Sequence, residues 1–180
     1  LLKRRCRMLA ETRGDLPEFP WFESVLFLDA SGSPLDLSDR GRTLQLCKTL
    51  RSHLPVYVAI DVLRDAFLGE SRSDEVAGAV MANLRAVAAA TQGGIVEGIM
   101  HTRKGGPDGR PDKHARDALA GSYKWFASAD VVVFFPAPNR EGLVRMSWDK
   151  IREGEARPEP TWLRWRSKGV GLEITAPPED

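Results

Sequence analysis

Val56–Asp61, with the sequence VYVAID, is the stretch on which the expected fold depends. Its apolar, valine-containing run predicts a strand buried on both faces, as in parallel sheets that helices cover on each side. The run ends on an acid, Asp61. Ligands collect at the carboxyl ends of strands in open α/β sheets. A carboxylate there could hold a magnesium ion and through it a phosphate, or it could cap the following turn.

Helices and strands alternate along the rest of the chain. Capping side chains and apolar residues at helical spacing predict the helices, and apolar or alternating runs predict the strands. The predicted helices cover residues 2–13, 38–52, 73–92 and 121–129. The predicted strands cover residues 23–28, 95–101, 131–135, 143–148, 161–165 and 170–175. The pattern predicts an α/β fold with a mostly parallel central sheet flanked by helices and antiparallel strands at the carboxyl-terminal end. We expect a single domain over 1–176 and a tail at 177–180.

Composition bounds the class of protein. The chain has 180 residues, of which 42% are hydrophobic and 28% charged, as in an ordinary globular domain. A net charge of +1 gives no global attraction to nucleic acid or to a membrane. Two cysteines without a metal or redox motif indicate a reducing compartment, which we expect to be the cytoplasm. No apolar run approaches the length of a membrane span, and no membrane partner is expected.

Two further stretches have more than one possible interpretation. Glu97 shares a strand face with Ile95, Ile99 and His101, so that face is partly open or Glu97 has a partner. Residues 102–119 form a long polar loop, a kind of segment that is usually functional or disordered. Its basic residues are Arg103, Lys104, Arg110, Lys113 and Arg116.

Four stretches in a fixed order carry a resemblance to a known family. They are VYVAID with the Gly69-Glu70 loop, MHTRKG at 100–105, RDALAGSYKWFASADVVVFF at 116–135, and DKIREG at 149–154. Together they resemble the carboxyl-terminal two-thirds of a RecA-like motor domain, and most closely the hexameric replicative helicases of the RepA and DnaB type. The resemblance runs from about Leu2 to Ile174.

The resemblance implies roles for residues at two strand ends. As the last residue of a Walker B strand, Asp61 would orient magnesium-bound water, and Glu70 stands where the RepA branch often carries an acid. His101 and Lys104 match a strand-end sensor that usually has two histidines, the first of which is replaced here by Met100. A polar group at such a strand end can hydrogen-bond the γ-phosphate or its attacking water.

The resemblance also implies roles for the later motifs. Ser122 of the Gly-Ser pair would contribute to the nucleotide site. Ala120 stands where many relatives carry arginine, for which Arg116 or Lys124 could substitute. Lys150 and Arg152 would project from one subunit into its neighbour's nucleotide site. Because they are spaced by one residue, they point to the same side of a strand. Such trans-acting arginines raise the rate of phosphoryl transfer by a factor of about 10³–10⁵.

A phosphate-binding loop of the form G-x-x-x-x-G-K-[ST] does not occur in the 180 residues. In the resembled family this loop lies upstream, and its backbone amides and lysine hold the β- and γ-phosphates. We therefore expect an amino-terminal truncation. The chain would then carry about half of an active site and bind ATP poorly by itself.

Three functions are open at this stage. The first is an ATP- and Mg²⁺-dependent motor, which the resemblance implies to be a homo-oligomer of six copies. Its basic loop would follow single-stranded DNA in a salt-dependent way. The second is a non-catalytic RecA-like module that assembles with or regulates a complete ATPase. The third is a metal-dependent phosphoesterase that uses Asp29, Asp61, Asp65 and His101.

Overall fold

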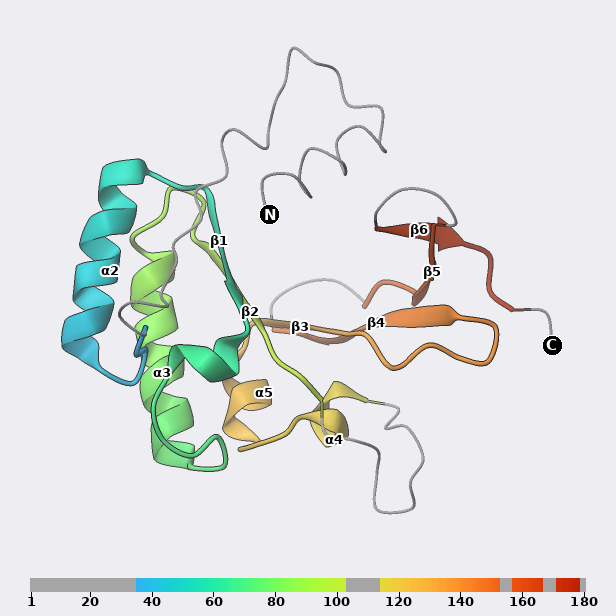
Figure 1. Cartoon of the computed structure of the whole chain (residues 1–180), viewed down its shortest axis with the longest axis horizontal. Helices are drawn as coiled ribbons and strands as arrows, with labels where there is room; N and C mark the ends of the chain where they lie inside the picture. The colour runs from blue at the N-terminus through green and yellow to red at the C-terminus, as the bar shows by residue number, and fades with distance from the viewer. Residues whose placement is uncertain (1–34, 103–113, 153–156, 167–170, 179–180) are drawn as a thin grey trace, which may run out of the picture. The chain divides into compact units, whose positions relative to one another are not determined.

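The computed structural model of the chain describes residues 35–102, 114–152, 157–166 and 171–178 (Figure 1). These residues belong to two units. The parallel-strand unit comprises the described residues up to Val132 together with 149–152, and the antiparallel-strand unit comprises 133–148, 157–166 and 171–178. The predicted helix at 2–13 and strand at 23–28 lie outside the described residues. In the described ranges, no helix is long and apolar enough to span a membrane.

The two long helices of the parallel-strand unit begin where their capping residues predict. Helix α2 (Arg40–His53) starts after Asp39, whose side chain accepts a hydrogen bond from the Arg42 backbone N–H at 3.0 Å. Helix α3 (Asp74–Ala88) starts after Ser73, whose hydroxyl accepts one from the Val76 N–H at 3.2 Å. Each cap satisfies a backbone donor that would otherwise lack a helical partner. Both predicted helix starts are confirmed.

Each of these two helices is followed in the chain by a strand of a parallel pair. Strand β1 (Tyr57–Asp61) pairs in parallel with β2 (Ile95–Ile99), and α3 forms the connection between them. Helix α2 packs on α3, and α3 packs against β2 (Figure 1). Gly93, just before β2, lets the backbone before β1 come close to it, because a Cβ at this position would lie 2.2 Å from the Val56 carbonyl oxygen. The core between helices and strands includes Cys47, Leu50, Ile60, Val80 and Val87.

The expectation that β1 is buried on both faces is wrong. Ile60 is buried and packs with the helices, but Tyr57 and Ile95 on the other face are 48% and 52% exposed. The physical reason is that α2 and α3 pack together against the same side of the two strands, and no described helix covers the other side. Glu97 lies on this open face and accepts a hydrogen bond from the Tyr57 hydroxyl. Both possibilities considered for Glu97 therefore hold.

Short helical segments complete the parallel-strand unit. The 3₁₀ helix η2 (Leu63–Ala66) follows β1, and α4 (Ala115–Ala118) and α5 (Lys124–Ser128) follow β2. The buried ring of Trp125 on α5 lies 5.2 Å from that of Phe67, centroid to centroid. Its indole N–H donates to the Ser71 carbonyl at 2.9 Å. Trp125 therefore holds α5 against the loop that leads into α3.

The remaining strands form a four-stranded sheet in the order β3-β4-β5-β6. Their bounds are β3 (Val131–Phe134), β4 (Leu143–Ile151), β5 (Thr161–Trp165) and β6 (Leu172–Thr175). The β4–β5 and β5–β6 pairs are antiparallel, which confirms the predicted antiparallel strands. The class of the fold is mixed α/β.

Strand β3 differs from the expectation of a mostly parallel sheet. It lies beside β4, and the parallel part of the described residues consists of β1 and β2 alone. The connection from β3 to β4 is short, and the Asn139 side chain accepts hydrogen bonds from the Glu141 and Leu143 N–H groups within it. A parallel return would require a crossover of a dozen residues or more. The short turn therefore favours the neighbour that follows in sequence.

Candidate functional site

Asp61 and His101 lie at the same edge of the parallel strand pair. Asp61 is opposite Ile99 in the register, and His101 follows Ile99 by two residues. Both side chains are exposed. Because the strands are parallel, their carboxyl ends meet at one edge, as we expected from the sequence. Thr102, the next residue, forms an isolated antiparallel bridge with Leu119, so the chain leaves this edge and returns to it.

The turn after Asp61 is held against β2 by packing. Leu63, the first residue of η2, is only 3% exposed. Its side chain fills the space beside Gly98, where a Cβ would lie 2.9 Å from the Leu63 Cδ2 atom. The Arg64 guanidinium lies over the Phe67 ring, 5.0 Å from its centroid. This packing fixes the direction in which the chain leaves the Asp61 end of β1.

A buried carboxylate anchors the other end of the same segment. Asp36 accepts hydrogen bonds from the Leu68 N–H at 3.1 Å and the Ser38 N–H at 3.0 Å. Burial alone raises the pKa of Asp36, but the hydrogen bonds from Ser38 and Leu68 and the charge of Arg42 outweigh it and lower the pKa overall. Asp36 thus ties the residues before α2 to the residues after η2. No spacing pattern in the sequence predicts this contact.

Ser122 contacts the loop before α3 that also carries Glu70. Glu70 is exposed, whereas Ser122 is buried, and the Ser122 backbone N–H donates to the Ser71 carbonyl at 2.9 Å. The Ser122 hydroxyl donates to Asp74 and accepts from the Lys124 N–H at 2.9 Å. These bonds hold the Gly-Ser turn on the Glu70 loop. In this arrangement the hydroxyl is committed to partners within its own chain.

Lys150 of β4 and Arg152, one residue beyond the end of β4, project to the same side, as their spacing predicts. The Lys150 ammonium donates to the carbonyls of Phe126 at 2.9 Å and Ala127 at 2.7 Å. The Arg152 guanidinium donates to the Ala127 carbonyl at 3.2 Å and pairs with Asp130 at 3.0 Å. Both cations therefore lie at the carboxyl-terminal end of α5, where free carbonyls favour positive charge.

A third cation, Arg85 of α3, reaches the same end of α5. Arg85 donates to the Ser128 carbonyl at 3.1 Å, and Arg152 donates to the same oxygen at 3.3 Å. Desolvation by burial lowers the pKa of Lys150, the nearby Arg152 lowers it further, and Asp130 partly opposes them. Sequence reasoning missed both Arg85 and Asp130. The helical spacing of α3 does contain a feature that could have indicated Arg85.

That feature is Gly78, which lies seven residues before Arg85 and thus on the same helix face. A Cβ at Gly78 would meet the Lys124 side chain of α5 at 3.1 Å. The small residue therefore marks the face of α3 on which α5 packs. A glycine inside a helix lowers its stability, so its presence at this position indicates close packing by another element.

Asp149 points to the opposite side of β4 from Lys150. Its buried side chain accepts a hydrogen bond from the Ala115 N–H at the start of α4, and it lies 4.0 Å from the Nδ1 atom of His114. The stretch Asp149–Arg152 thus contacts α4 with one side and α5 with the other. The resembled motif is, in this chain, also the junction of these two short helices.

The predicted DNA-binding loop is described in part. Arg116 lies on α4, exposed, with its guanidinium 5.9 Å from the Tyr123 ring centroid and 3.8 Å from the Asp117 carboxylate. The other predicted DNA-binding residues, Arg103, Lys104, Arg110 and Lys113, lie outside the described residues, as does Asp29. Their roles stay predictions.

The donor set at the Asp61 edge fits one kind of metal site. Among the described residues, no three His, Cys, Asp or Glu side chains come together to hold a metal ion. Magnesium, however, is usually bound through one or two carboxylates together with substrate phosphates. Asp61, exposed at a strand end, fits that second arrangement and not a cage made by protein ligands alone.

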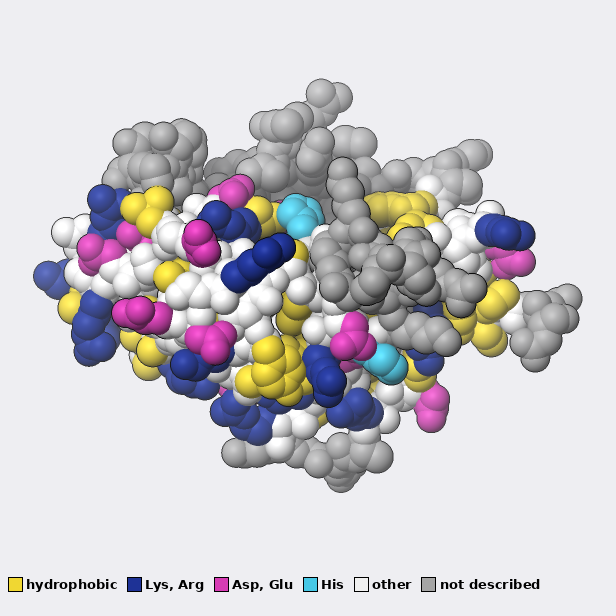
Figure 2. Space-filling model, turned by 90° about the horizontal axis from the view of Figure 1, so that it is seen from below, with side chains coloured by type: hydrophobic (Ala, Val, Ile, Leu, Met, Phe, Trp, Pro, Cys, Tyr) yellow, Lys and Arg dark blue, Asp and Glu magenta, His cyan; other side chains and the backbone are white. Residues whose placement is uncertain are grey.

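Basic and acidic side chains are interspersed on the face that Figure 2 shows, which agrees with the net charge of +1. Any surface that selects an anionic partner is therefore local. No protein-family model matches this chain, and no curated protein matches it in sequence.

Proposed function

We propose that this chain supplies the Walker B and sensor edge of a RecA-like ATPase that moves along single-stranded DNA. The observation that supports the proposal is the shared edge of β1 and β2, which carries Asp61 and the segment leading to His101 on adjacent parallel strands. A carboxylate and an imidazole at neighbouring strand ends are suited to a phosphoryl-transfer site. The RecA-like fold is part of the proposal.

In this proposal each residue at the edge has a separate task. Magnesium, when bound with ATP, supplies positive charge that offsets the charge on the phosphates. Asp61 would accept hydrogen bonds from water bound to the magnesium ion and orient that water. His101 would hydrogen-bond the γ-phosphate or the attacking water. The bridge between Thr102 and Leu119 then links the sensor to both ends of the basic loop, through which hydrolysis would change the contact with DNA.

In this proposal, Arg152 reaches the neighbouring subunit's nucleotide in a ring that has six copies by analogy with the resembled family. The Arg152 side chain is 41% exposed although it pairs with Asp130. A guanidinium has five N–H donors, so one edge can stay on Asp130 while another meets a phosphate. The contacts at α5 would then set the orientation of the side chain.

The experiment measures ATP hydrolysis by the full-length gene product with and without single-stranded DNA. We expect DNA to stimulate hydrolysis and Asp61→Asn to abolish most of it. The matched control is Asp65→Asn, because Asp65 is an exposed acid on η2, four residues further along. Full activity of Asp61→Asn, or no stimulation by DNA, contradicts the motor. Loss of metal-dependent phosphoesterase activity in both variants would instead support the metal-dependent phosphoesterase.

A second candidate function is a non-catalytic module that assembles with or regulates a complete ATPase. It is favoured by the partners of Ser122, Lys150 and Arg152, which all lie within the same chain. In that case these side chains stabilise the fold and need no nucleotide. The gene sequence upstream of Leu1 separates the two functions, because the motor requires an encoded phosphate loop and the module does not.

A further inference from the structure

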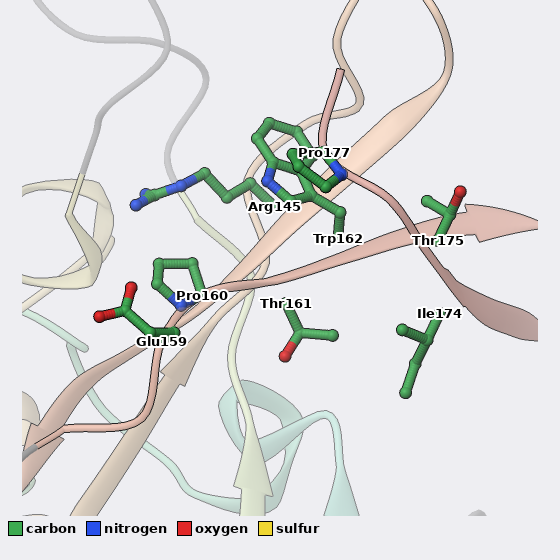
Figure 3. A pocket seen from close by; sticks show the side chains of 8 residues that line it. All are labelled: Arg145, Glu159, Pro160, Thr161, Trp162, Ile174, Thr175 and Pro177. Carbon is green, nitrogen blue, oxygen red and sulfur yellow. The ribbon is translucent and has the colours of Figure 1, made fainter. Parts of the chain in front are cut away.

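A pocket of about 470 Å³ opens in the antiparallel-strand unit (Figure 3). This volume lies within the range of roughly 300–1,000 Å³ that is usual for small-ligand sites. The pocket lies where β5 begins and β6 ends. Its lining residues are Arg145, Glu159, Pro160, Thr161, Trp162, Ile174, Thr175 and Pro177.

A row of three side chains crosses one face of the sheet at this pocket. In the register, Trp162 is opposite Arg145 of β4 on one side and Thr175 of β6 on the other. Directly opposed residues in antiparallel strands point to the same face and lie close enough to contact one ligand. Trp162 is half-buried, so its indole is fixed by packing while part of it stays accessible. Pro177, labelled in Figure 3, also lines the pocket.

Two charged groups of the pocket are uncommitted. Among the described residues, neither Arg145 nor Glu159 has an ion-pair or hydrogen-bond partner through its side chain, whereas Arg164 and Arg166 both approach Glu173. The described residues of this unit carry five arginines against three glutamates, and no aspartate or lysine. The described part of this unit thus has a small excess of positive charge, while the pocket itself holds one cation and one anion, and Arg145 is the cation that is free to bind an anionic group.

We propose that this pocket binds one nucleotide of a single-stranded nucleic acid. The base stacks on the Trp162 indole, Arg145 pairs with the adjacent phosphate, and Glu159 accepts a hydrogen bond from an amino group of the base. An indole, a free guanidinium and a carboxylate match a base, a phosphate and a base edge. The inference rests on the proposed function for the identity of the strand, and it adds a stacking position to the predicted electrostatic contact of the basic loop.

The test is a binding titration of the full 180-residue chain with a fluorescein-labelled oligodeoxycytidylate, whose bases carry an amino group, without ATP, followed by anisotropy. Trp162→Ala should weaken binding by about 5- to 150-fold, the usual effect of losing one stacked base. Arg145→Ala should reduce the slope of log affinity against log salt by about 0.7, as expected for one phosphate of a single strand. Trp162→Phe and Arg145→Lys should retain most of the affinity and of the slope, respectively.

The matched control is Trp165→Ala. Trp165 is the more exposed indole, at 64%, but strand alternation places it on the opposite face of β5 and outside the pocket. Unchanged affinity in Trp162→Ala, or an equal loss in Trp165→Ala, overturns the inference, as does saturable binding of a proline-rich peptide that the oligonucleotide cannot displace. Since Trp162→Ala could lower stability, the exposed Arg145→Glu variant must show the same loss with an unchanged melting temperature.

The same titration separates this inference from the motor itself. Asp61→Asn should bind the oligonucleotide as the unaltered chain does, because Asp61 lies in the other unit and the titration contains no ATP. If Trp162→Ala binds normally while Asp61→Asn loses hydrolysis, the pocket assignment fails and the motor stands. If Trp162→Ala loses binding and Asp61→Asn keeps hydrolysis, the motor fails and the nucleic-acid pocket stands.

Discussion

Replacing Arg152 by alanine distinguishes a structural cation from a trans-acting one, because the two roles predict very different magnitudes. In the structure, Arg152 makes one ion pair with Asp130, and both side chains are substantially exposed, at 41% and 69%. Exposed pairs contribute about 0.2–1 kcal/mol. Its hydrogen bonds to the Ala127 and Ser128 carbonyls are long, at 3.2 and 3.3 Å, and add about 0.5 kcal/mol each. Arg152→Ala should therefore cost about 1–2 kcal/mol of unfolding free energy.

The catalytic role predicts a far larger effect on rate. Loss of a trans-acting arginine lowers turnover by about 10³–10⁵, which corresponds to about 4–7 kcal/mol of transition-state stabilisation. The assay compares urea unfolding with DNA-stimulated ATP hydrolysis of the full-length product. Arg85→Ala is the control, since Arg85 shares the Ser128 carbonyl with Arg152 but is assigned no phosphate. It should lose less stability, about 0.5 kcal/mol for its hydrogen bond to Ser128, and keep its turnover.

Mixing subunits tests whether Arg152 acts on a neighbour. Arg152→Ala and Asp61→Asn subunits should each be inactive alone, whereas mixed rings should regain activity. The regained sites pair an intact Asp61 on one subunit with an intact Arg152 on the next. Turnover of Arg152→Ala within a few-fold of the unaltered protein, or equal losses of turnover in Arg152→Ala and Arg85→Ala, would refute the assignment. The contacts at α5 would then be the whole role of the side chain.

Three further predictions concern the parallel-strand unit. Burial, the hydrogen bond to Glu97 and the charge of Glu97 raise the pKa of Tyr57 to about 12, so the stability that the neutral phenol contributes should be present below pH 10 and lost as the pH rises through about 12. Ultraviolet titration of a variant without the other tyrosine measures this pKa, which should fall toward 10 when Glu97→Gln is added. Asp36→Ala leaves two backbone N–H groups without an acceptor and should lower the free energy of unfolding in urea by about 2–4 kcal/mol. Asp36→Asn keeps an acceptor and should lower it by about 1 kcal/mol; equal losses in the two variants would contradict the hydrogen-bonding account. Ser122→Ala removes the hydrogen bond to Asp74 and should lower the free energy of unfolding by about 1–3 kcal/mol. In this variant the backbone amide hydrogens near the start of α3 should exchange faster; an unchanged unfolding midpoint would show that the hydroxyl does not stabilise the fold.

The elements set by local chemistry were predictable. Asp39 and Ser73 cap the helices that their sequences predicted, because capping depends on residues only a few positions apart. The shared edge of Asp61 and His101 was predictable for a related reason. A helix between two apolar strands brings the carboxyl ends of those strands together.

Contacts between distant residues were not predictable in the same way. The Val131–Phe134 run is apolar enough for a buried parallel strand, yet its neighbour is set by the short turn around Asn139. Lys150 and Arg152 bind backbone carbonyls of α5, and a carbonyl acceptor leaves no mark in residue type. The outer face of β1 shows the same difficulty, because the apolar run alone does not tell how many of its faces the helices cover.

The most direct test of the central claim is the position of the metal relative to Asp61 and His101. Crystals of the full-length product with Mn²⁺ and a non-hydrolysable ATP analogue would show the ion by anomalous scattering. We predict a peak beside the carboxyl edge of β1 and β2, with its water shell within hydrogen-bonding reach of Asp61 and with His101 directed at the γ-phosphate. A nucleotide bound elsewhere, with neither side chain near the metal or the phosphates, would contradict the account.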